Sequence, residues 1–391
     1  MQPLEGTTVI EFSTMITASF AAMMMAEQGA RVIKVESVNV GDPMRYLGTS
    51  KGGISALFAN CNRGKSSMAL DLKQRAGQEI VKSMVSTADV LIHNYRPGVM
   101  EQLDLGSESL RSENPRLIYT AISGFGIRGP LNNAPAYDPV VQAHAGFAAM
   151  QGTDGPEFIR SLICDKITAY TACQAVTAAL LVREKTNEGQ HIDISMLDSG
   201  LFFLFPDGFM NHTLLDNDVE VRQHIADVMY NLTETRDGGI IISAATKQHI
   251  RGTLQVAGRD DLLDDPRFAT LVTLIENIEE FKEMIKDGFS NMTSNEAMQK
   301  LQEKDVPCAE CHNHEEVINQ SQIDVSETLL VRNHPLMGSM RIVKSPSRFS
   351  GEQSEPGYHC PAHGESTESL LKEWSYTEEQ IAEFRQKKVI S

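Results

Sequence analysis

Residues 8–36 read TVIEFSTMITASFAAMMMAEQGARVIKVE, and this stretch decides the fold of the chain. Its two ends, TVIEF (residues 8–12) and RVIKVE (residues 31–36), are short runs rich in β-branched apolar residues, which predicts two buried strands. The Met- and Ala-rich segment between them, residues 20–28, predicts a helix that Ser19 caps and that Gly29 ends. A strand, a helix and a second strand in this order predict a parallel sheet with helices on its faces.

The alternation of strands and helices continues through the first half of the chain. A helix is predicted over residues 73–88, and a longer helix, rich in Ala and Thr, follows Asp165. Similar apolar runs predict further strands at residues 66–72, 89–94, 116–123 and 189–196.

The composition changes from about residue 216, which predicts a second, smaller domain. Its expected elements are a strand, GGIIISAA at residues 238–245, and helices through residues 276–305. The apolar segment LFFLFPDGF, within residues 197–209, is predicted to be a buried helix that leads into a linker. We therefore predict an α/β fold with a large Rossmann-like parallel-sheet domain (residues 1–200 and 327–391), a linker (residues 201–215) and a smaller α+β domain (residues 216–326).

The charge balance limits the partners of this protein. The chain of 391 residues carries 35 Lys and Arg against 52 Asp and Glu, a formal net charge of −17. Such an acidic chain is not expected to bind nucleic acid or an anionic membrane surface. An anionic ligand would need a local group of basic residues.

Cysteine usage and the N-terminal sequence predict a cytoplasmic protein. The six cysteines are scattered, as in proteins of a reducing compartment. The most apolar early stretch, residues 16–26, is too short to span a bilayer, and no basic segment with a cleavage site precedes it.

Asp165 has two interpretations, which are compatible. Asp is a favoured N-cap residue, because its side-chain oxygen accepts hydrogen bonds from the free N–H groups of the first helical turn. A carboxylate at a helix N-terminus is also expected to stay ionised and held in one orientation, which suits a nucleophile in covalent catalysis.

Two predicted strand ends carry residues suited to binding an anion. Ligands of open α/β sheets bind outside the carboxyl ends of the strands. Residues 70–73 and residues 94–96 lie at such ends. The basic residues that could supply local positive charge there are Arg45, Arg63, Lys65, Lys73 and Arg96.

Several motifs in order along the chain carry a family resemblance. SGFGIRGP (residues 123–130) and YDPVVQAHAG (residues 137–146) precede Asp165 and its small-residue helix. With them the chain resembles the class III coenzyme A transferases, which include formyl-CoA transferase, the carnitine CoA-transferases and the related α-methylacyl-CoA racemases. The other matching strings are RVIKVE (31–36), GDPMR (41–45), NRGKSSMALDLK (62–73), NYRPGVMEQLDLG (94–106) and HGESTESLLKEWSYTEEQI (363–381).

The resemblance implies that the chain is a CoA-transferase with Asp165 as its catalytic nucleophile. It implies acyl-CoA and a small carboxylic acid as substrates, an aspartyl-CoA thioester as intermediate, no prosthetic group, and a homodimer of two interlocked chains. Gly238 and Gly239 are the candidates for the family's glycine-rich loop on the acceptor side. The implied coenzyme A contacts are Ile16, Thr17, Arg45, Leu70, Asp71, Leu72, Lys73, Asn94, Tyr95, Arg96, Tyr137 and Asp138.

Two other functions stay open at the level of sequence. An α-methylacyl-CoA racemase needs a base on each side of the α-carbon, and racemases of this family have a His-Asp pair where this chain has Tyr137 and Asp138. Tyr is a poor base near neutral pH, which favours the transferase. A CoA-binding protein without activity is the third interpretation, because a fold alone does not establish catalysis.

One motif resembles a metal-binding site. CAECHNH, residues 308–314, contains a C-x-x-C-H pattern and offers four nitrogen and sulfur donors. It lies where the family has a plain loop, and haem attachment would require export. We therefore expect no metal there.

Overall fold

The computed structural model describes residues 2–152, 154–350, 352–353 and 359–391. The chain forms two compact units. The first comprises Met1–Phe205 and Val325–Ser391, and the second comprises Pro206–Asp324.

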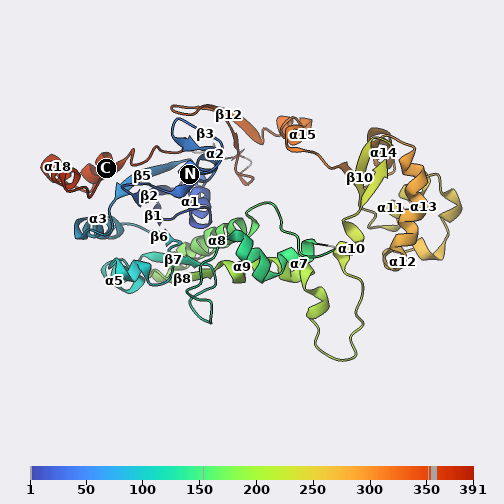
Figure 1. Ribbon diagram of the computed structural model, residues 1–391, viewed down its shortest axis with the longest axis horizontal. Coiled ribbons are helices and arrows are strands. Elements are labelled where there is room, and N and C mark those ends of the chain that lie inside the picture. The colour runs from blue at the N-terminus through green and yellow to red at the C-terminus, as the bar shows by residue number, and fades with distance from the viewer. Residues whose placement is uncertain (1, 153, 351, 354–358) are drawn as a thin grey trace. The chain divides into compact units, whose positions relative to one another are not determined.

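The first unit is built on a six-stranded sheet with the strand order β5-β2-β1-β6-β7-β8 (Figure 1). All five strand pairs in it are parallel, which confirms the predicted parallel sheet. The chain order runs outward from β1 in one direction and from β6 in the other, so it reverses between these two strands. The strands are β1 (Thr8–Phe12), β2 (Arg31–Ser37), β5 (Lys65–Leu70), β6 (Val90–His93), β7 (Ile118–Ser123) and β8 (His191–Ser195).

Helices cover both faces of this sheet because successive strand residues point to opposite sides. Ile10 and Phe12 of β1 face an apolar core shared with α3 (Arg75–Val85), α5 (Ser107–Glu113), α17 (Thr367–Glu373) and α18 (Glu378–Gln386). Glu11, between them, points to the opposite face. There α1 (Thr17–Glu27) and α8 (Ile163–Thr186) pack against each other.

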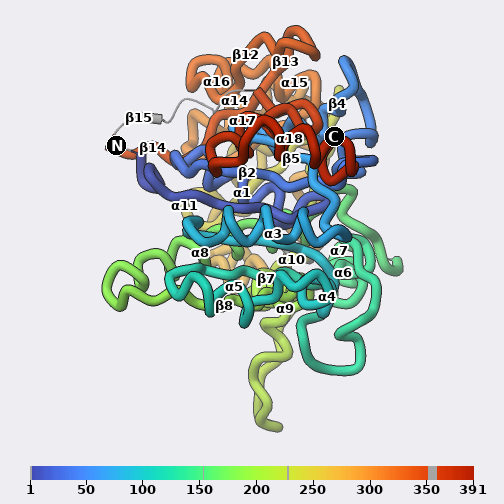
Figure 2. Tube along the Cα trace, turned by 90° about the vertical axis from the view of Figure 1, so that its left-hand side faces the viewer, coloured from blue at the N-terminus to red at the C-terminus, as the bar shows by residue number. Residues whose placement is uncertain are grey.

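The C-terminal segment returns to the large sheet at β5 (Figure 2). Ile390 forms an isolated antiparallel bridge with Leu70, and the N–H of Asp71 donates to the carbonyl oxygen of Val389 at 2.8 Å. The end of β5 is therefore covered by residues more than 300 positions away in the sequence.

Smaller elements complete the first unit. Two of them, β12 (Leu329–His334) and β13 (Gly338–Val343), form an antiparallel hairpin. The others are η1 (Pro43–Tyr46), β3 (Ser50–Lys51), β4 (Ile54–Ser55), α2 (Ala56–Asn62), α4 (Val99–Gln102), α6 (Asp138–Ala145), α7 (Phe147–Gln151), α9 (Met196–Gly208, which runs into the second unit), β14 (Arg348–Phe349) and β15 (Glu352–Gln353).

The second unit has its own three-stranded antiparallel sheet, β11-β10-β9, and its own apolar core. Ile240 of β10 is buried in that core with Phe281 and Phe289 of α13. The elements are η2 (Met210–His212), α10 (Ile225–Met229), β9 (Leu232–Thr235), β10 (Gly238–Ile242), α11 (Lys247–Val256), η3 (Asp260–Leu262), η4 (Pro266–Phe268), α12 (Leu271–Glu276), α13 (Ile278–Ser290), α14 (Ser294–Glu303), β11 (Cys308–Glu310), α15 (His314–Ile318) and α16 (Ser321–Val325).

Three local expectations are wrong. Helix α1 begins at Thr17 rather than at residue 20, and the hydroxyl of Ser19 bonds to Ser13 instead of capping the helix. Asp165 is not the N-cap of α8, because the cap position is Leu162 and Asp165 lies within the first turn. Helix α9 is not buried in this single chain, where Phe202 is 84% exposed.

No helix among the described residues has both the length and the hydropathy that crossing a membrane requires.

Candidate active site

The loop after β1 and the end of β6 meet where the strand order of the sheet reverses. Asn94, directly after β6, accepts a hydrogen bond from the N–H of Thr14 at 3.0 Å. Its side-chain amide donates to the carbonyl oxygen of Thr14 at 2.6 Å and to the hydroxyl of Thr17 at 2.9 Å. Open α/β sheets bind their ligands at such a reversal, outside the carboxyl ends of the strands. This edge of the sheet is therefore the candidate ligand site.

Three of the predicted coenzyme A contacts have buried side chains here. Ile16 is 4% exposed, Thr17 is 3% exposed and Arg45 is 2% exposed. The guanidinium of Arg45 donates to Glu36 at 2.7 Å and lies 3.7 Å from the ring centre of Phe58. Burial alone would raise the pKa of Glu36, but the hydrogen bonds from Arg45 lower it to about 2. The charge of Arg45 is thus matched inside the protein.

Other predicted contacts lie at the surface of the same edge. Lys73 and Arg96 are exposed, Asp71, Leu72 and Tyr95 are half-buried, and Leu70 is buried. Strands β5 and β6 are three places apart in the sheet, so their ends are separated by roughly 14 Å. Only an extended ligand could contact both ends.

Asp165 lies in the first turn of α8 and is 8% exposed. Its backbone N–H donates to the carboxylate of Asp138, at the start of α6, at 3.0 Å. The second oxygen of Asp138 accepts from the side-chain amide of Gln142 at 2.6 Å. Tyr137, the residue before Asp138, is 68% exposed. Asp138, which precedes the predicted nucleophile by 27 residues in the sequence, therefore fixes the backbone of Asp165.

The pKa of the Asp165 carboxyl group is raised above its ordinary value. Burial raises its pKa to about 7, and the negative charge of Asp138 acts in the same direction. The expectation that the helix N-terminus keeps Asp165 ionised is therefore wrong. Desolvation outweighs the helix dipole, because the dipole contributes at most about 2 kcal/mol in a partly buried position, whereas burial can shift a carboxyl pKa by several units.

The start of α8 lies beside the loop that follows β1. Leu162, the cap residue of α8, packs against an apolar cluster that contains Ile16 and Met44, and Met15 and Phe20 pack against the same cluster. The start of α8, whose first turn carries Asp165, and the β1–α1 loop therefore pack against one apolar cluster.

The sequence interpretation missed a group of buried charges beneath this loop. They include Glu11 and Lys34, which occupy facing register positions in β1 and β2. A signal was present in the sequence, because each charge stands between two apolar residues of a strand of a parallel sheet, Glu11 in TVIEF and Lys34 in RVIKVE.

Gly238 and Gly239 belong to the second unit, where they open β10. A side chain at Gly239 would come within 2.7 Å of Leu232 in the neighbouring strand β9, whereas Gly238 has room for one. A side chain at position 239 would therefore require Leu232 to move.

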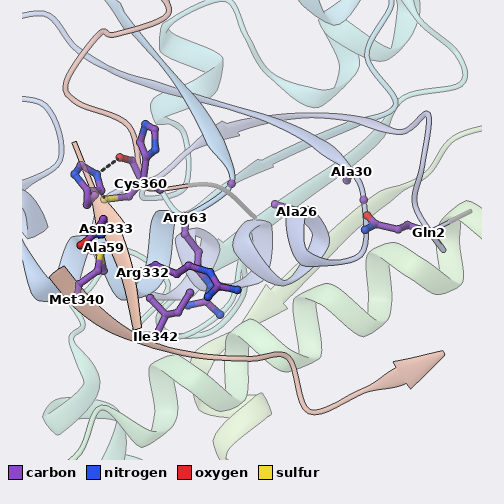
Figure 3. A pocket seen from close by; sticks show the side chains of 14 residues that line it. Gln2, Ala26, Ala30, Ala59, Arg63, Arg332, Asn333, Met340, Ile342 and Cys360 are labelled. Atoms are coloured by element: carbon purple, nitrogen blue, oxygen red, sulfur yellow. Dashed lines mark hydrogen bonds between the residues drawn. The ribbon is translucent and has the colours of Figure 1, made fainter. Parts of the chain in front are cut away.

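A cavity of about 580 Å³ lies in the first unit between α1, α2 and the β12–β13 hairpin (Figure 3). Its polar groups are already engaged. Arg63 donates to Glu27 at 2.7 Å, and both ring nitrogens of His334 bond to backbone groups, Nε2 to the carbonyl oxygen of Cys360 and Nδ1 to the N–H of Leu336. Of the basic residues proposed from the sequence for anion binding, Arg63 lines this cavity, but its charge is paired with Glu27 and it is not part of the site at the sheet edge.

The motif at residues 308–314 divides between β11, a loop and the start of α15. Nowhere in the described parts of the chain do three or more His, Cys, Asp or Glu side chains group so as to hold a metal ion.

Comparisons with known proteins agree on one family. The model of CoA-transferase family III matches residues 4–367. The acetyl-CoA:oxalate CoA-transferase of Acetobacter aceti is 30% identical, with 96% of this chain and 97% of that protein covered. The succinate–glutarate CoA-transferase of Agrobacterium fabrum is 31% identical, with 82% of this chain and 83% of that protein covered.

A solved structure shares the fold over nearly the whole chain. A CAIB/BAIF family protein from Brucella suis has a TM-score of 0.83 at 26% identity, and the match covers 95% of this chain and 99% of that one. This similarity agrees with the α/β fold and the six-stranded parallel sheet described above. The chain belongs to CoA-transferase family III and is an enzyme of that class.

Proposed function

We propose that this enzyme transfers coenzyme A from an acyl-CoA donor to a small carboxylic acid through an aspartyl-CoA thioester on Asp165. One observation carries the proposal. Asp165 is a buried carboxyl group in the first turn of α8, its backbone is fixed by Asp138, and the start of α8 packs against the same apolar cluster as the loop at the reversal of the sheet.

The proposed reaction begins when the ionised carboxylate of Asp165 attacks the thioester carbonyl of the donor. The carbon–sulfur bond breaks, which gives a mixed anhydride and the thiolate of coenzyme A. The thiolate then attacks the aspartyl carbonyl, which forms the aspartyl-CoA thioester and frees the donor acid as its carboxylate. The acceptor carboxylate reverses these steps, so Asp165 is regenerated and a new acyl-CoA leaves.

The surroundings of Asp165 suit this sequence of steps. A poorly solvated carboxylate is a stronger nucleophile than one in water, and a pKa of about 7 leaves a substantial ionised fraction at neutral pH. Each tetrahedral transition state carries negative charge on oxygen, and backbone N–H groups would stabilise it. We propose Gly238 and Gly239 as donors on the acceptor side.

The exposed cations at the strand ends are proposed to bind the phosphates of coenzyme A. Lys73 and Arg96 lie on the same edge as Asn94, and their charges point to solvent rather than into internal ion pairs of the sheet. The names of the relatives suggest short mono- and dicarboxylic acids as substrates. A screen of acetyl-, formyl- and succinyl-CoA against oxalate and glutarate would identify the pair.

Mass spectrometry tests the proposed intermediate. After incubation with an active acyl-CoA donor and no acceptor, the peptide that contains Asp165 should gain the mass of coenzyme A. Asp165→Asn should bind coenzyme A but gain no mass. Binding by the wild-type protein without any adduct or transfer, across the whole screen, would instead support a CoA-binding protein without activity.

Proton exchange separates the transferase from the racemase. The partner-base position holds Tyr137, which is exposed and a weak base near neutral pH. We therefore expect no deuterium at the α-carbon of a single epimer of 2-methylacyl-CoA in deuterated water. Rapid uptake with loss of optical activity would establish the racemase instead.

We further propose that the enzyme is a cytoplasmic homodimer. The six cysteines are all free, as expected in a reducing compartment. Phe202 and Phe203 of α9 are 84% and 57% exposed in the single chain, so a second chain would have an apolar surface to cover.

A further inference from the structure

Four charged side chains are completely buried between the central sheet and α1. Lys34 of β2 lies 2.8 Å from Glu11 of β1 and 3.0 Å from Asp42, and Lys65 of β5 lies 2.7 Å from Glu11. None of these side chains is exposed to solvent. Two ammonium groups face two carboxylates, so the cluster Glu11–Lys34–Asp42–Lys65 is neutral as a whole. We call these four residues the ion cluster.

The ion cluster is bonded to the backbone and hydroxyl groups of residues 13–19, which comprise the turn after β1 and the first residues of α1 and which we call the β1–α1 loop. The ammonium of Lys34 donates to the carbonyl oxygen of Ser13 at 3.2 Å, to its hydroxyl at 2.7 Å and to the hydroxyl of Ser19 at 3.2 Å. The ammonium of Lys65 donates to the carbonyl oxygen of Ser19 at 2.8 Å. Two lysines, one from each of the neighbouring strands β2 and β5, thus fix both ends of the loop.

The middle of the loop is held in a strained conformation. Met15 has a φ of +62°, in the left-handed region that non-glycine residues seldom adopt. Its N–H donates to Asp42 Oδ1 at 3.1 Å, and the same oxygen accepts from the N–H of Met44 at 2.9 Å. Strained residues persist only where their surroundings fix them, and they concentrate at functional sites. Asp42 joins this residue to the ion cluster.

The loop presents little surface apart from two residues. Thr14 and Met15 are partly exposed, whereas Ile16, Thr17 and Ser19 are buried. Thr14 is hydrogen-bonded to Asn94 at the reversal of the sheet, and Met15 packs against the apolar cluster of Ile16 and Met44, against which Leu162 at the start of α8 also packs. The exposed part of the loop is therefore bonded to one proposed coenzyme A residue and packs against the same apolar cluster as the start of the helix of Asp165.

A gain in the free energy of folding is a weak explanation for the four buried charges of the ion cluster. Taking ions out of water costs several kcal/mol for each, so a buried ion pair contributes little more than apolar residues of the same volume. The ion cluster instead fixes the direction of the loop, because Lys34 donates to three of its oxygens and Lys65 donates to a fourth, the carbonyl oxygen of Ser19.

We propose that Lys34, Lys65, Glu11 and Asp42 are positioning residues that fix the β1–α1 loop so that Thr14 and Met15 contact the bound acyl-CoA beside Asp165. This inference rests on the proposed function, because it takes the site at Asp165 to bind coenzyme A thioesters. The four residues do not touch the ligand themselves.

The double variant Glu11→Gln/Lys65→Met tests the proposal. It removes one positive and one negative charge, so the cluster stays neutral, while Ser19 loses the lysine that holds it. We expect the dissociation constant for coenzyme A, measured by calorimetry, and KM for the acyl-CoA donor to rise at least tenfold. We expect kcat to fall much less, because Asp165 is untouched. Hydrogen exchange of the amides of Thr14 and Met15 should become faster.

The matched control is Glu27→Gln/Arg63→Met. Glu27 and Arg63 form another buried pair, 2.7 Å apart, that joins α1 to the residue after α2 and does not touch the loop. The control should lower the melting temperature and leave KM, coenzyme A affinity and exchange in residues 13–19 within twofold of wild type. Equal effects from both double variants would overturn the positioning role.

A milder variant keeps the test valid if the double variant does not fold. Asp42→Asn retains a side-chain oxygen for the N–H of Met15 and removes only the charge that faces Lys34. We expect exchange at Met15 to increase and KM to rise about threefold. Unchanged exchange and KM in a folded Asp42→Asn protein would contradict the proposal. Wild-type protein that binds no coenzyme A would contradict the proposed function instead.

Discussion

Asp165 and Asp138 are close enough that the charge of one opposes the ionisation of the other. Burial and Asp138 together place the pKa of Asp165 at about 7, and the proposed nucleophile is the ionised form. We therefore expect kcat/KM for acyl-CoA to rise with pH and to level off above about pH 8. Asp138→Asn keeps an oxygen for the N–H of Asp165 but removes the charge. Its pH–rate profile should have a midpoint at lower pH than that of wild type.

Asp193→Asn is the control for this measurement, because Asp193 is an exposed carboxylate of β8 that pairs with His191. Its profile should coincide with that of wild type. A profile of Asp138→Asn that also coincides with wild type would mean that another group controls the pH dependence.

The same pKa has a consequence for stability. Asp165 binds its proton more tightly in the folded chain than in the unfolded chain, so its stabilising contribution is complete at acid pH. That contribution is lost as the pH rises from about 4 to about 7. Asn cannot ionise, so Asp165→Asn should lose less stability than wild type between pH 5 and pH 8, with a difference of up to about 2.7 kcal/mol. Urea unfolding at both pH values measures this, and an identical loss in both proteins would contradict the raised pKa.

At the scale of elements, the ends of β5 and β6 are expected to bind the phosphates. Lys73→Ala and Arg96→Ala should each raise KM for acyl-CoA about tenfold, which corresponds to about 1.4 kcal/mol. We expect little change in kcat, because phosphate contacts are equally strong in the ground state and the transition state. Steady-state kinetics at low ionic strength gives both constants.

Lys185→Ala removes the same charge as Lys73→Ala from the end of α8, next to the start of β8 and so at the opposite edge of the sheet. It should leave KM unchanged. If the two strand-end variants behave like Lys185→Ala, the phosphates bind elsewhere.

The strands were predictable and the helix starts were not, for a physical reason. A buried strand can be predicted from its own apolar residues. The predicted ranges of β1 and β2 therefore match the observed ranges to within one residue. A helix start depends on what satisfies its free N–H groups. At α8 the N–H of Asp165 donates a hydrogen bond to Asp138, 27 residues earlier. At α1 the hydroxyl of Ser19 is hydrogen-bonded to that of Ser13. Neither partner can be identified from local sequence.

At the scale of the whole molecule, the distribution of charge could not be inferred from composition. Arg45, Arg63 and Lys65 were candidates for a basic surface, yet each is buried against a glutamate, Glu36, Glu27 and Glu11 respectively. Pairs formed by residues up to 54 positions apart are set by the topology of the sheet. The sequence therefore overestimated the positive charge at the site, and Lys73 and Arg96 are the exposed cations among those five candidates.

The exposed apolar surface of α9 leads to a prediction about assembly. Leu201, Phe202, Phe203 and Phe205 are 36%, 84%, 57% and 42% exposed in the single chain, so they form one apolar stretch rather than a scattered residue. We expect this stretch to be covered by a second copy of the chain, and we expect wild type to have the mass of a dimer by light scattering.

A charge at the centre of this stretch tests the assembly. Phe202→Glu should shift the mass towards a monomer at micromolar concentration, because an unpaired carboxylate cannot be buried in an apolar interface without a large cost. Val272→Glu, at a site of α12 that is 49% exposed, is the matched control and should remain a dimer. Wild type with the mass of a monomer, or a fully dimeric Phe202→Glu, would show that α9 is not where two chains associate.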